Sequence, residues 1–144
     1  MSRANVTVVF NGAIYNFKEL REELTREGFD FTTESDTEVL LQAYRCYGID
    51  CLEKFNGQWA FLIYDLEKSM VIACRDRLGI KPLYYFDQTH QIQFSSEMKA
   101  FVELDRRLNS TRAVEFLTYG MHDHTSETLF KGIYKIPPGH YGKI

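Results

Sequence analysis

Several features that would mark other classes of protein are scarce in this sequence. Its 144 residues include only three cysteines, three prolines and one tryptophan. Cys46, Cys51 and Cys74 are odd in number and form no CxxC pair, which speaks against a disulfide framework and a cysteine-ligated zinc site. Free thiols are compatible with a reducing compartment, so we expect a cytoplasmic protein.

Neither sign of charge dominates, and long apolar runs are missing. The 17 lysines and arginines are interspersed with 20 aspartates and glutamates, giving a net charge of −3 and no basic stripe that would attract nucleic acid. Asp65 and Glu67 break the longest apolar stretch, and the first residues lack the apolar segment of a signal peptide. We therefore expect no nucleic-acid partner and no membrane segment.

The remaining composition is that of a globular domain rich in strands. Hydrophobic residues make up 44% of the chain and aromatic residues 15%, chiefly 11 Phe and 9 Tyr. Phe and Tyr favour strands that pack on a core. Because no repeat, low-complexity segment or linker interrupts the chain, residues 1–144 are expected to form one domain.

The pattern along the chain predicts strands before and after a helical region. Residues 5–10 are apolar and mostly β-branched, without polar alternation, which predicts a strand buried on both faces. Asn11-Gly12 is typical of a tight turn with positive φ at its end. Pro137-Pro138-Gly139 predicts a turn. Further strands are expected at 59–64, 70–74, 83–86, 91–95, 134–136 and 141–144, with hairpins at 59–74 and 83–95.

Two helices carry start and stop signals. Asn16 and Ser35 are each followed three residues later by a glutamate, which is the spacing of a capping box. Apolar residues then recur at helical spacing until Gly28 and Gly48 end the two helices. The order of elements indicates an α+β fold, with helices on a mostly antiparallel sheet. Shorter helices are expected at 96–103 and from 111 or 112 to 119.

Six short motifs follow one another along the chain: NGAIYN at 11–16, SDTEV at 35–39, NGQWAF at 56–61, RDRLGIKPLYY at 75–85, SSEMKA at 95–100 and IPPGHY at 136–141. Together they resemble the glutaminase domain of glutamine-hydrolysing asparagine synthetases, a class II glutamine amidotransferase domain with the N-terminal-nucleophile hydrolase fold. The resemblance runs from residue 6 onward, and six collinear matches make it specific. It implies that the α+β fold is part of an αββα sandwich.

The resemblance also identifies segments that are missing. In the family, a Cys-Gly-Ile stretch supplies the nucleophile and an Arg-Gly-Pro-Asp stretch holds the substrate carboxylate; neither occurs here. The family continues into an ATP-dependent synthetase domain, which would hold ATP and magnesium, so we expect no cofactor in this chain. The sequence thus resembles a glutaminase domain truncated at its N-terminus, which is expected to be inactive alone.

Hydrolysis of glutamine passes through a tetrahedral oxyanion, which fixed hydrogen-bond donors stabilise. The resemblance implies that the Asn11 side chain and the Gly12 backbone N–H are these donors. A strand-ending Asn-Gly turn would present an amide and a bare backbone to a pocket, which suits this chemistry. For an isolated Asn-Gly pair, the alternative is a plain turn.

Two positions bear on the α-amino group of glutamine. The resemblance implies that Asp36 binds this amine, although an acidic residue in a first helical turn also stabilises the helix. Ala13 stands where the family has a glutamate that also binds the amine. Losing one partner of a desolvated charge pair costs on the order of 2–5 kcal/mol, so glutamine affinity should fall. A neighbouring carboxylate that compensates is the alternative.

Other reactive side chains have plainer interpretations. The three cysteines are expected to be small buried residues, and Ser2, a nucleophile candidate after removal of Met1, should lie away from the Asn11-Gly12 turn. Residues 75–82 are expected to be structural, with Arg75 paired to a carboxylate. The loop at 122–124, His-Asp-His, has metal-ligand chemistry but is more typical of a solvated turn, so no metal site is predicted.

Three hypotheses follow for the whole chain. It is a piece of an asparagine-synthetase-like enzyme, a decayed amidotransferase module that now serves as a scaffold or interaction surface, or one part of a split amidotransferase. The expected partners are L-glutamine, a synthetase-domain partner chain, and a second copy of this chain through unpaired strands. The acceptor is left open between aspartate, a nucleotide sugar and an antibiotic precursor.

Overall fold

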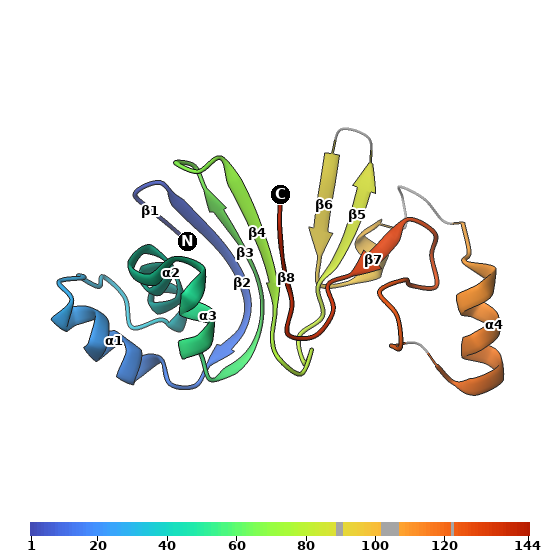
Figure 1. Cartoon of the computed structure of the whole chain (residues 1–144), viewed down its shortest axis with the longest axis horizontal. Coiled ribbons are helices and arrows are strands. Elements are labelled where there is room, and N and C mark those ends of the chain that lie inside the picture. Colours follow the sequence, from blue (N-terminus) through green and yellow to red (C-terminus); the bar gives the residue numbers. More distant parts are fainter. Residues whose placement is uncertain (89–90, 102–106, 122) are drawn as a thin grey trace.

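The computed structural model describes residues 1–88, 91–101, 107–121 and 123–144, which form two antiparallel sheets with helices outside them (Figure 1). The large sheet has the order β1-β2-β3-β4-β8, and the small sheet has the order β6-β5-β7. The helical elements are α1 (Phe17–Arg26), α2 (Asp36–Tyr47), η1 (Gly48–Asp50), α3 (Cys51–Lys54), η2 (Met98–Phe101) and α4 (Ser110–Tyr119). The strands are β1 (Ser2–Arg3), β2 (Val6–Ile14), β3 (Gly57–Asp65), β4 (Met70–Arg75), β5 (Tyr84–Gln88), β6 (Gln91–Ser95), β7 (Ile133–Lys135) and β8 (Tyr141–Lys143).

The layers confirm the predicted α+β class with antiparallel strands. Helices α1, α2 and α3 lie on one side of the large sheet, the small sheet lies on the other side, and α4 lies beyond β7 (Figure 1). Every pairing within the two sheets is antiparallel. The expected hairpins form as β3–β4 and β5–β6. In the described residues, no helix combines the length and the apolar character needed to cross a membrane.

Strand β2 differs from its prediction in two ways. It continues through Asn11 and Gly12 to Ile14, so the prediction of a tight turn at Asn11-Gly12 is wrong. It is also not buried on both faces, because Val8 is 1% exposed whereas its neighbour Val9 is 65% exposed. Successive residues of a strand face opposite ways, and here one face packs on the helices while the other is left partly uncovered.

Helix α2 begins as predicted, whereas α1 does not. The Ser35 hydroxyl accepts the Glu38 N–H at 3.2 Å, so Ser35 caps α2. Asn16 precedes α1 without capping it; its side chain instead donates to Lys54 O at 2.9 Å and accepts the Asn56 N–H at 2.9 Å. Asn16 therefore joins the start of α1 to the start of β3, a distant contact that local spacing does not reveal.

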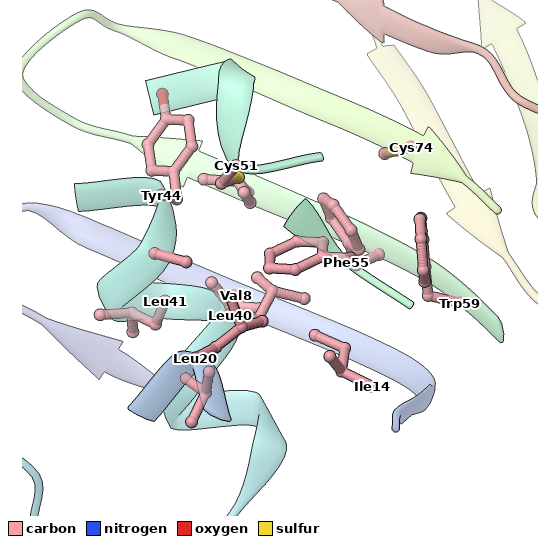
Figure 2. Close-up of a cluster of buried hydrophobic side chains, with 14 of the residues drawn as sticks. Val8, Ile14, Leu20, Leu40, Leu41, Tyr44, Cys51, Phe55, Trp59 and Cys74 are labelled. Carbon is pink, nitrogen blue, oxygen red and sulfur yellow. The ribbon is translucent and has the colours of Figure 1, made fainter. Parts of the chain in front are cut away.

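The main core lies between the large sheet and α1–α3 (Figure 2). Leu40 and Ile63 are fully buried in it, and Phe55 meets Trp59 edge-on with ring centroids 5.7 Å apart. A second, smaller cluster lies between the two sheets, and a third lies beneath β5 and β7 around Phe101. Most of the apolar burial that drives folding is thus on the helical side of the large sheet.

The C-terminal half needs further corrections. The helix expected at 96–103 is the short η2, and residues 102 and 103 lie outside the described residues. Helix α4 forms as expected, with the Asn109 side chain accepting the Arg112 N–H at 3.4 Å. The two strands around residues 137–139 belong to different sheets, β7 to the small one and β8 to the large one. This turn therefore joins the two layers.

Candidate functional site

The edge of β2 is the first part of the candidate site. The Val8 N–H donates to Met1 O at 2.8 Å, so the backbone groups of Val8 point toward β1. Alternate residues of a strand direct their backbone groups to the same side, which places the Gly12 and Ile14 N–H groups on this edge. Because β1 pairs with the beginning of β2 only, a ligand lying along the edge can meet the Gly12 N–H.

Gly12 is held in close contact with the neighbouring strand. It pairs with Trp59 of β3 and has a φ of +156°. A Cβ at this position would lie 2.2 Å from Gln58 O and 2.7 Å from the Trp59 Cα. Glycine is therefore required here by a close approach inside a sheet, and not by the turn that the Asn-Gly pair suggests.

Asp36 lies at the other end of this edge. It is the first residue of α2, and its Oδ2 accepts the Ile14 N–H at 3.0 Å. The Asp36 side chain thereby fastens the start of α2 to the end of β2. The structure thus brings Asp36 to the strand that carries Asn11, Gly12 and Ala13, although the two segments are distant in the sequence.

Asn11 faces the small sheet, on the side of β2 opposite to the helices. It pairs with Ala60, a member of the cluster between the two sheets. Its Nδ2 donates to the Ser96 hydroxyl oxygen at 3.1 Å. The two side chains line a pocket of about 180 Å³ together with apolar residues such as Leu83 and Phe94. Ser96 belongs to the SSEMKA motif, for which the sequence predicted no function.

Ala13 is half-buried, and its backbone pairs with Gln58. Its side chain lies on the same face of β2 as that of Asn11, because the two residues are two apart in a strand. Among the described residues, Asp36 is the only acidic side chain that hydrogen-bonds to the segment 11–14. One carboxylate, that of Asp36, therefore lies against this segment of β2.

The cysteines do not meet this site. Burial raises the pKa of Cys51 and that of Cys74 to about 12, so neither thiol ionises readily at neutral pH. Cys74 belongs to the core on the helical side of the sheet, near Phe55 and Trp59 (Figure 2), whereas Asn11 faces the other way. The expectation of small buried residues is confirmed for Cys51 and Cys74, while Cys46 is half-buried.

Ser2 also lies away from the Asn11-Gly12 segment. It pairs with Thr7, and the two side-chain oxygens are 2.9 Å apart. Thr7 precedes Asn11 by four residues on β2, or about 13 Å at the usual rise of a strand. The Met1 amine donates to Val8 O at 2.8 Å. The expectation that the intervening strand carries Ser2 away from the Asn-Gly pair is confirmed.

The Arg75-Asp76 segment is structural, but not by the predicted ion pair. The Arg75 guanidinium donates to the carbonyl oxygens of Gly79, Lys81 and Ile136 at 2.7–2.9 Å, and not to a carboxylate among the described residues. Burial alone would raise the pKa of Asp76, but hydrogen bonds from four backbone N–H groups have the larger effect and hold the pKa below its usual value. The donors are Lys81, Ile80, Trp59 and Leu78. Arg75 and Asp76 thereby fix the turn that leads from the large sheet to the small one.

Asp123 and His124 make polar contacts with neighbouring elements. His124 Nε2 lies 2.8 Å from a Glu115 carboxylate oxygen, and Asp123 pairs with the buried Lys135. His122 lies outside the described residues. No group of three or more metal-ligating side chains occurs in the part of the chain that the structure describes.

Comparison with known proteins assigns the family. The family model described as a glutamine amidotransferase domain matches residues 1–144. The chain belongs to this family. Two Bacillus subtilis (strain 168) relatives, asparagine synthetase (glutamine-hydrolyzing) 3 and 1, are 37% and 39% identical over 137 and 134 residues. They cover 93% and 92% of this glutamine amidotransferase domain, which spans 22% and 21% of their lengths.

A solved structure supports the same fold. The glutamine phosphoribosylpyrophosphate amidotransferase from Bacillus subtilis, complexed with ADP and GMP, superimposes with a TM-score of 0.68 at 24% sequence identity. The match covers 99% of this glutamine amidotransferase domain and 28% of that chain. At this identity the likeness concerns the fold, so the roles of individual residues rest on their geometry.

Proposed function

We propose that Asn11, Gly12 and Asp36 form part of a glutamine site, in which Asp36 binds the α-amino group. The observation that carries the proposal is the Asp36–Ile14 hydrogen bond of 3.0 Å, which sets the carboxylate at the end of the edge where the Gly12 N–H points. Glutamine lying along this edge would meet the carboxylate with its amine and the N–H with its side-chain carbonyl.

The chemistry supplied by these residues is stabilisation of a developing negative charge. When a nucleophile adds to the amide carbon of glutamine, its oxygen becomes an oxyanion. The Gly12 N–H and the Asn11 amide would donate to that oxygen, and one such donor is typically worth about 3 kcal/mol of transition-state stabilisation. Because the Gly12 N–H belongs to the backbone of β2, it is oriented before the substrate binds.

The nucleophile is proposed to come from outside these 144 residues. The pKa of about 12 makes Cys51 and Cys74 poor nucleophiles. Ser2 is fastened opposite Thr7. This chain alone is therefore expected to bind glutamine without hydrolysing it.

In the proposed assembly, ammonia released from glutamine passes to a separate synthetase part. That part would use ATP and magnesium to amidate aspartate or a related carboxylate, so the present chain would need neither. The names of the asparagine synthetase relatives, and the fact that the chain spans only about a fifth of their length, support this division. Free thiols favour the cytoplasm as its location.

A scaffold role is the second candidate, because two observations favour it. Ala13 removes one expected ligand of the glutamine amine. Helix α4 has no buried residue and exposes Leu117 and Tyr119 to 82% and 71%. A synthetase part that docks on α4 would cover these apolar side chains. The competing prediction is that two copies of this chain associate through the open edge of β2.

The glutamine site is tested by titrating the ¹⁵N-labelled chain with L-glutamine, and with D-glutamine as control, while recording the Gly12 and Ile14 amide signals. Asp36→Asn keeps an oxygen for the Ile14 N–H but removes the charge, so it should weaken L-glutamine binding about tenfold or more with the fold intact. Binding that is indifferent to Asp36→Asn, or equal for the two enantiomers, would contradict the proposal.

Glutamate release measured on the same samples tests the missing nucleophile. The chain and its Asn11→Ala variant should both release glutamate at the background rate. If the chain releases glutamate and Asn11→Ala does not, a nucleophile within the chain is at work, Ser2 first among the candidates.

A further inference from the structure

Ser96 reaches the candidate site from the other sheet. It follows the last residue of β6, whereas Asn11 lies on β2 of the large sheet. The Asn11 Nδ2 donates to the Ser96 hydroxyl oxygen at 3.1 Å, across 85 positions of sequence. This hydrogen bond is a direct polar link between two residues that line the same pocket.

An oxyanion donor on a side chain needs a fixed orientation. The Asn11 side chain is exposed and would otherwise rotate about two bonds, so its amide would sample many directions. A primary amide carries two N–H groups. When one of them is bound to Ser96, the amide plane is fixed and the second N–H keeps a defined direction toward a ligand.

Ser96 is itself held in place on both sides. Ser95 pairs with Tyr84 of β5, and its hydroxyl accepts the Glu97 N–H at 3.1 Å. Glu97 O accepts the Ala100 N–H at 3.2 Å, which begins the tight turn of η2. Phe101 at the end of η2 is 1% exposed and packs under the small sheet. The Ser96 hydroxyl therefore sits on a framework firm enough to orient Asn11.

We propose that Ser96 is a positioning residue of the glutamine site: it fixes the amide of Asn11 so that one N–H points to the oxyanion. The inference rests on the proposed function, because it takes Asn11 as an oxyanion donor. Ser96 acts through Asn11 and is not itself assigned a contact with the substrate. In this arrangement, the orientation of the Asn11 amide on the large sheet would depend on the packing of the small sheet.

The test uses the side-chain amide signals of Asn11 in the ¹⁵N-labelled full chain, identified by their loss in Asn11→Ala. Three variants are compared with the parent chain: Ser96→Ala, which removes the acceptor; Ser96→Thr, which keeps a hydroxyl; and Ser110→Ala, the matched control at the exposed first residue of α4. The measured quantities are the shifts of the two Nδ2 protons and their rates of exchange with water. Backbone amide shifts along β2 report whether each variant is folded.

In the parent chain the bound proton should exchange several-fold more slowly than exposed side-chain amides. Ser96→Ala should abolish that protection and move both proton shifts toward those of a free amide, while Ser96→Thr restores them and Ser110→Ala leaves them unchanged. The inference is overturned if Ser96→Ala leaves the Asn11 signals unchanged in a folded chain, or if Ser110→Ala has the same effect.

A glutamine titration of the same variants separates this inference from the proposed function. Because an oxyanion donor acts mainly in the transition state, Ser96→Ala should change L-glutamine affinity by no more than about twofold, in contrast to Asp36→Asn. If Ser96→Ala frees the Asn11 amide but L-glutamine moves no signal of the site in any variant, the glutamine site is rejected while the Ser96–Asn11 link stands.

Discussion

The face of the large sheet that packs on α1–α3 is closed, whereas the opposite face is covered only in part by the small sheet. Val8 and Ile63 on the closed face are at most 1% exposed, while Val9 on the other face is 65% exposed. The candidate site lies on the second face and on the bare edge of β2. Stability and the proposed glutamine site are thus carried by different sides of one strand.

The largest effect that tests this division is expected in the main core. Leu40 is fully buried between α2 and the sheet, so Leu40→Ala should lower the free energy of unfolding by about 4 kcal/mol. Leu117 on α4 is 82% exposed, and Leu117→Ala should change it by less than about 0.5 kcal/mol. Urea unfolding of both variants provides the measurement. Equal losses would mean that α4 packs as tightly as α2 and that the division is wrong.

Two glycines of the large sheet, Gly12 and Gly142, allow a comparison of a crowded position with an open one. Gly12→Ala would place a Cβ 2.2 Å from Gln58 O and should cost roughly 3 kcal/mol, with shifts along β2 and β3. Gly142→Ala on β8 is the control, because nothing lies within 4 Å of its added Cβ. Thermal unfolding of the two variants reports the difference. A tolerated Gly12→Ala would refute the close approach that defines the site edge.

The third effect concerns acid stability on the closed side. Burial raises the pKa of Glu38, but hydrogen bonds from Thr32 and Thr33 outweigh it and lower the pKa from 4.5 to about 2. A carboxyl whose pKa is lower in the folded than in the unfolded state stabilises the fold fully above about pH 5, and this stabilisation is lost as the pH falls to 2.

Glu38→Gln should therefore cost about 2 kcal/mol at pH 7 and flatten the loss of stability between pH 5 and 2. Glu34→Gln, at an exposed position of the loop that precedes α2, should leave both quantities unchanged. Unfolding in urea at several pH values makes the comparison. An unaltered pH dependence in Glu38→Gln would show that other carboxylates carry the acid sensitivity.

The closed side was predicted from sequence better than the open side. Helix α2 with its Ser35 cap follows from local spacing, because a cap and an apolar stripe are made by residues a few positions apart. Strand β2 was predicted too short and too buried. Its extension past Gly12 depends on pairing with β3, and its exposure depends on how far the small sheet reaches; both are tertiary facts.

The candidate site divides in the same way. Asn11, Gly12 and Asp36 were predicted through motif resemblance, and the structure brings Asp36 to the strand that carries the other two. Ser96 was missed as a partner of Asn11, because the two residues are 85 positions apart and no local rule links them. The SSEMKA motif that contains Ser96 was noticed, however. The signal available in the sequence was therefore a motif without an assigned role. Arg75 was correctly judged structural, but its partners are carbonyl groups from a distant turn.

The most direct test of the central claim is to restore the missing carboxylate. In Ala13→Glu, a second acidic side chain would stand on β2 one residue before Ile14, whose N–H donates to Asp36, so L-glutamine should bind about tenfold more tightly or better than to the parent chain, with the Gly12 and Ile14 amide signals shifting. Ala113→Glu on α4 adds the same charge elsewhere and should have no effect. Unchanged affinity in a folded Ala13→Glu chain, or an equal gain in Ala113→Glu, would contradict the claim that this edge of β2 is a glutamine site.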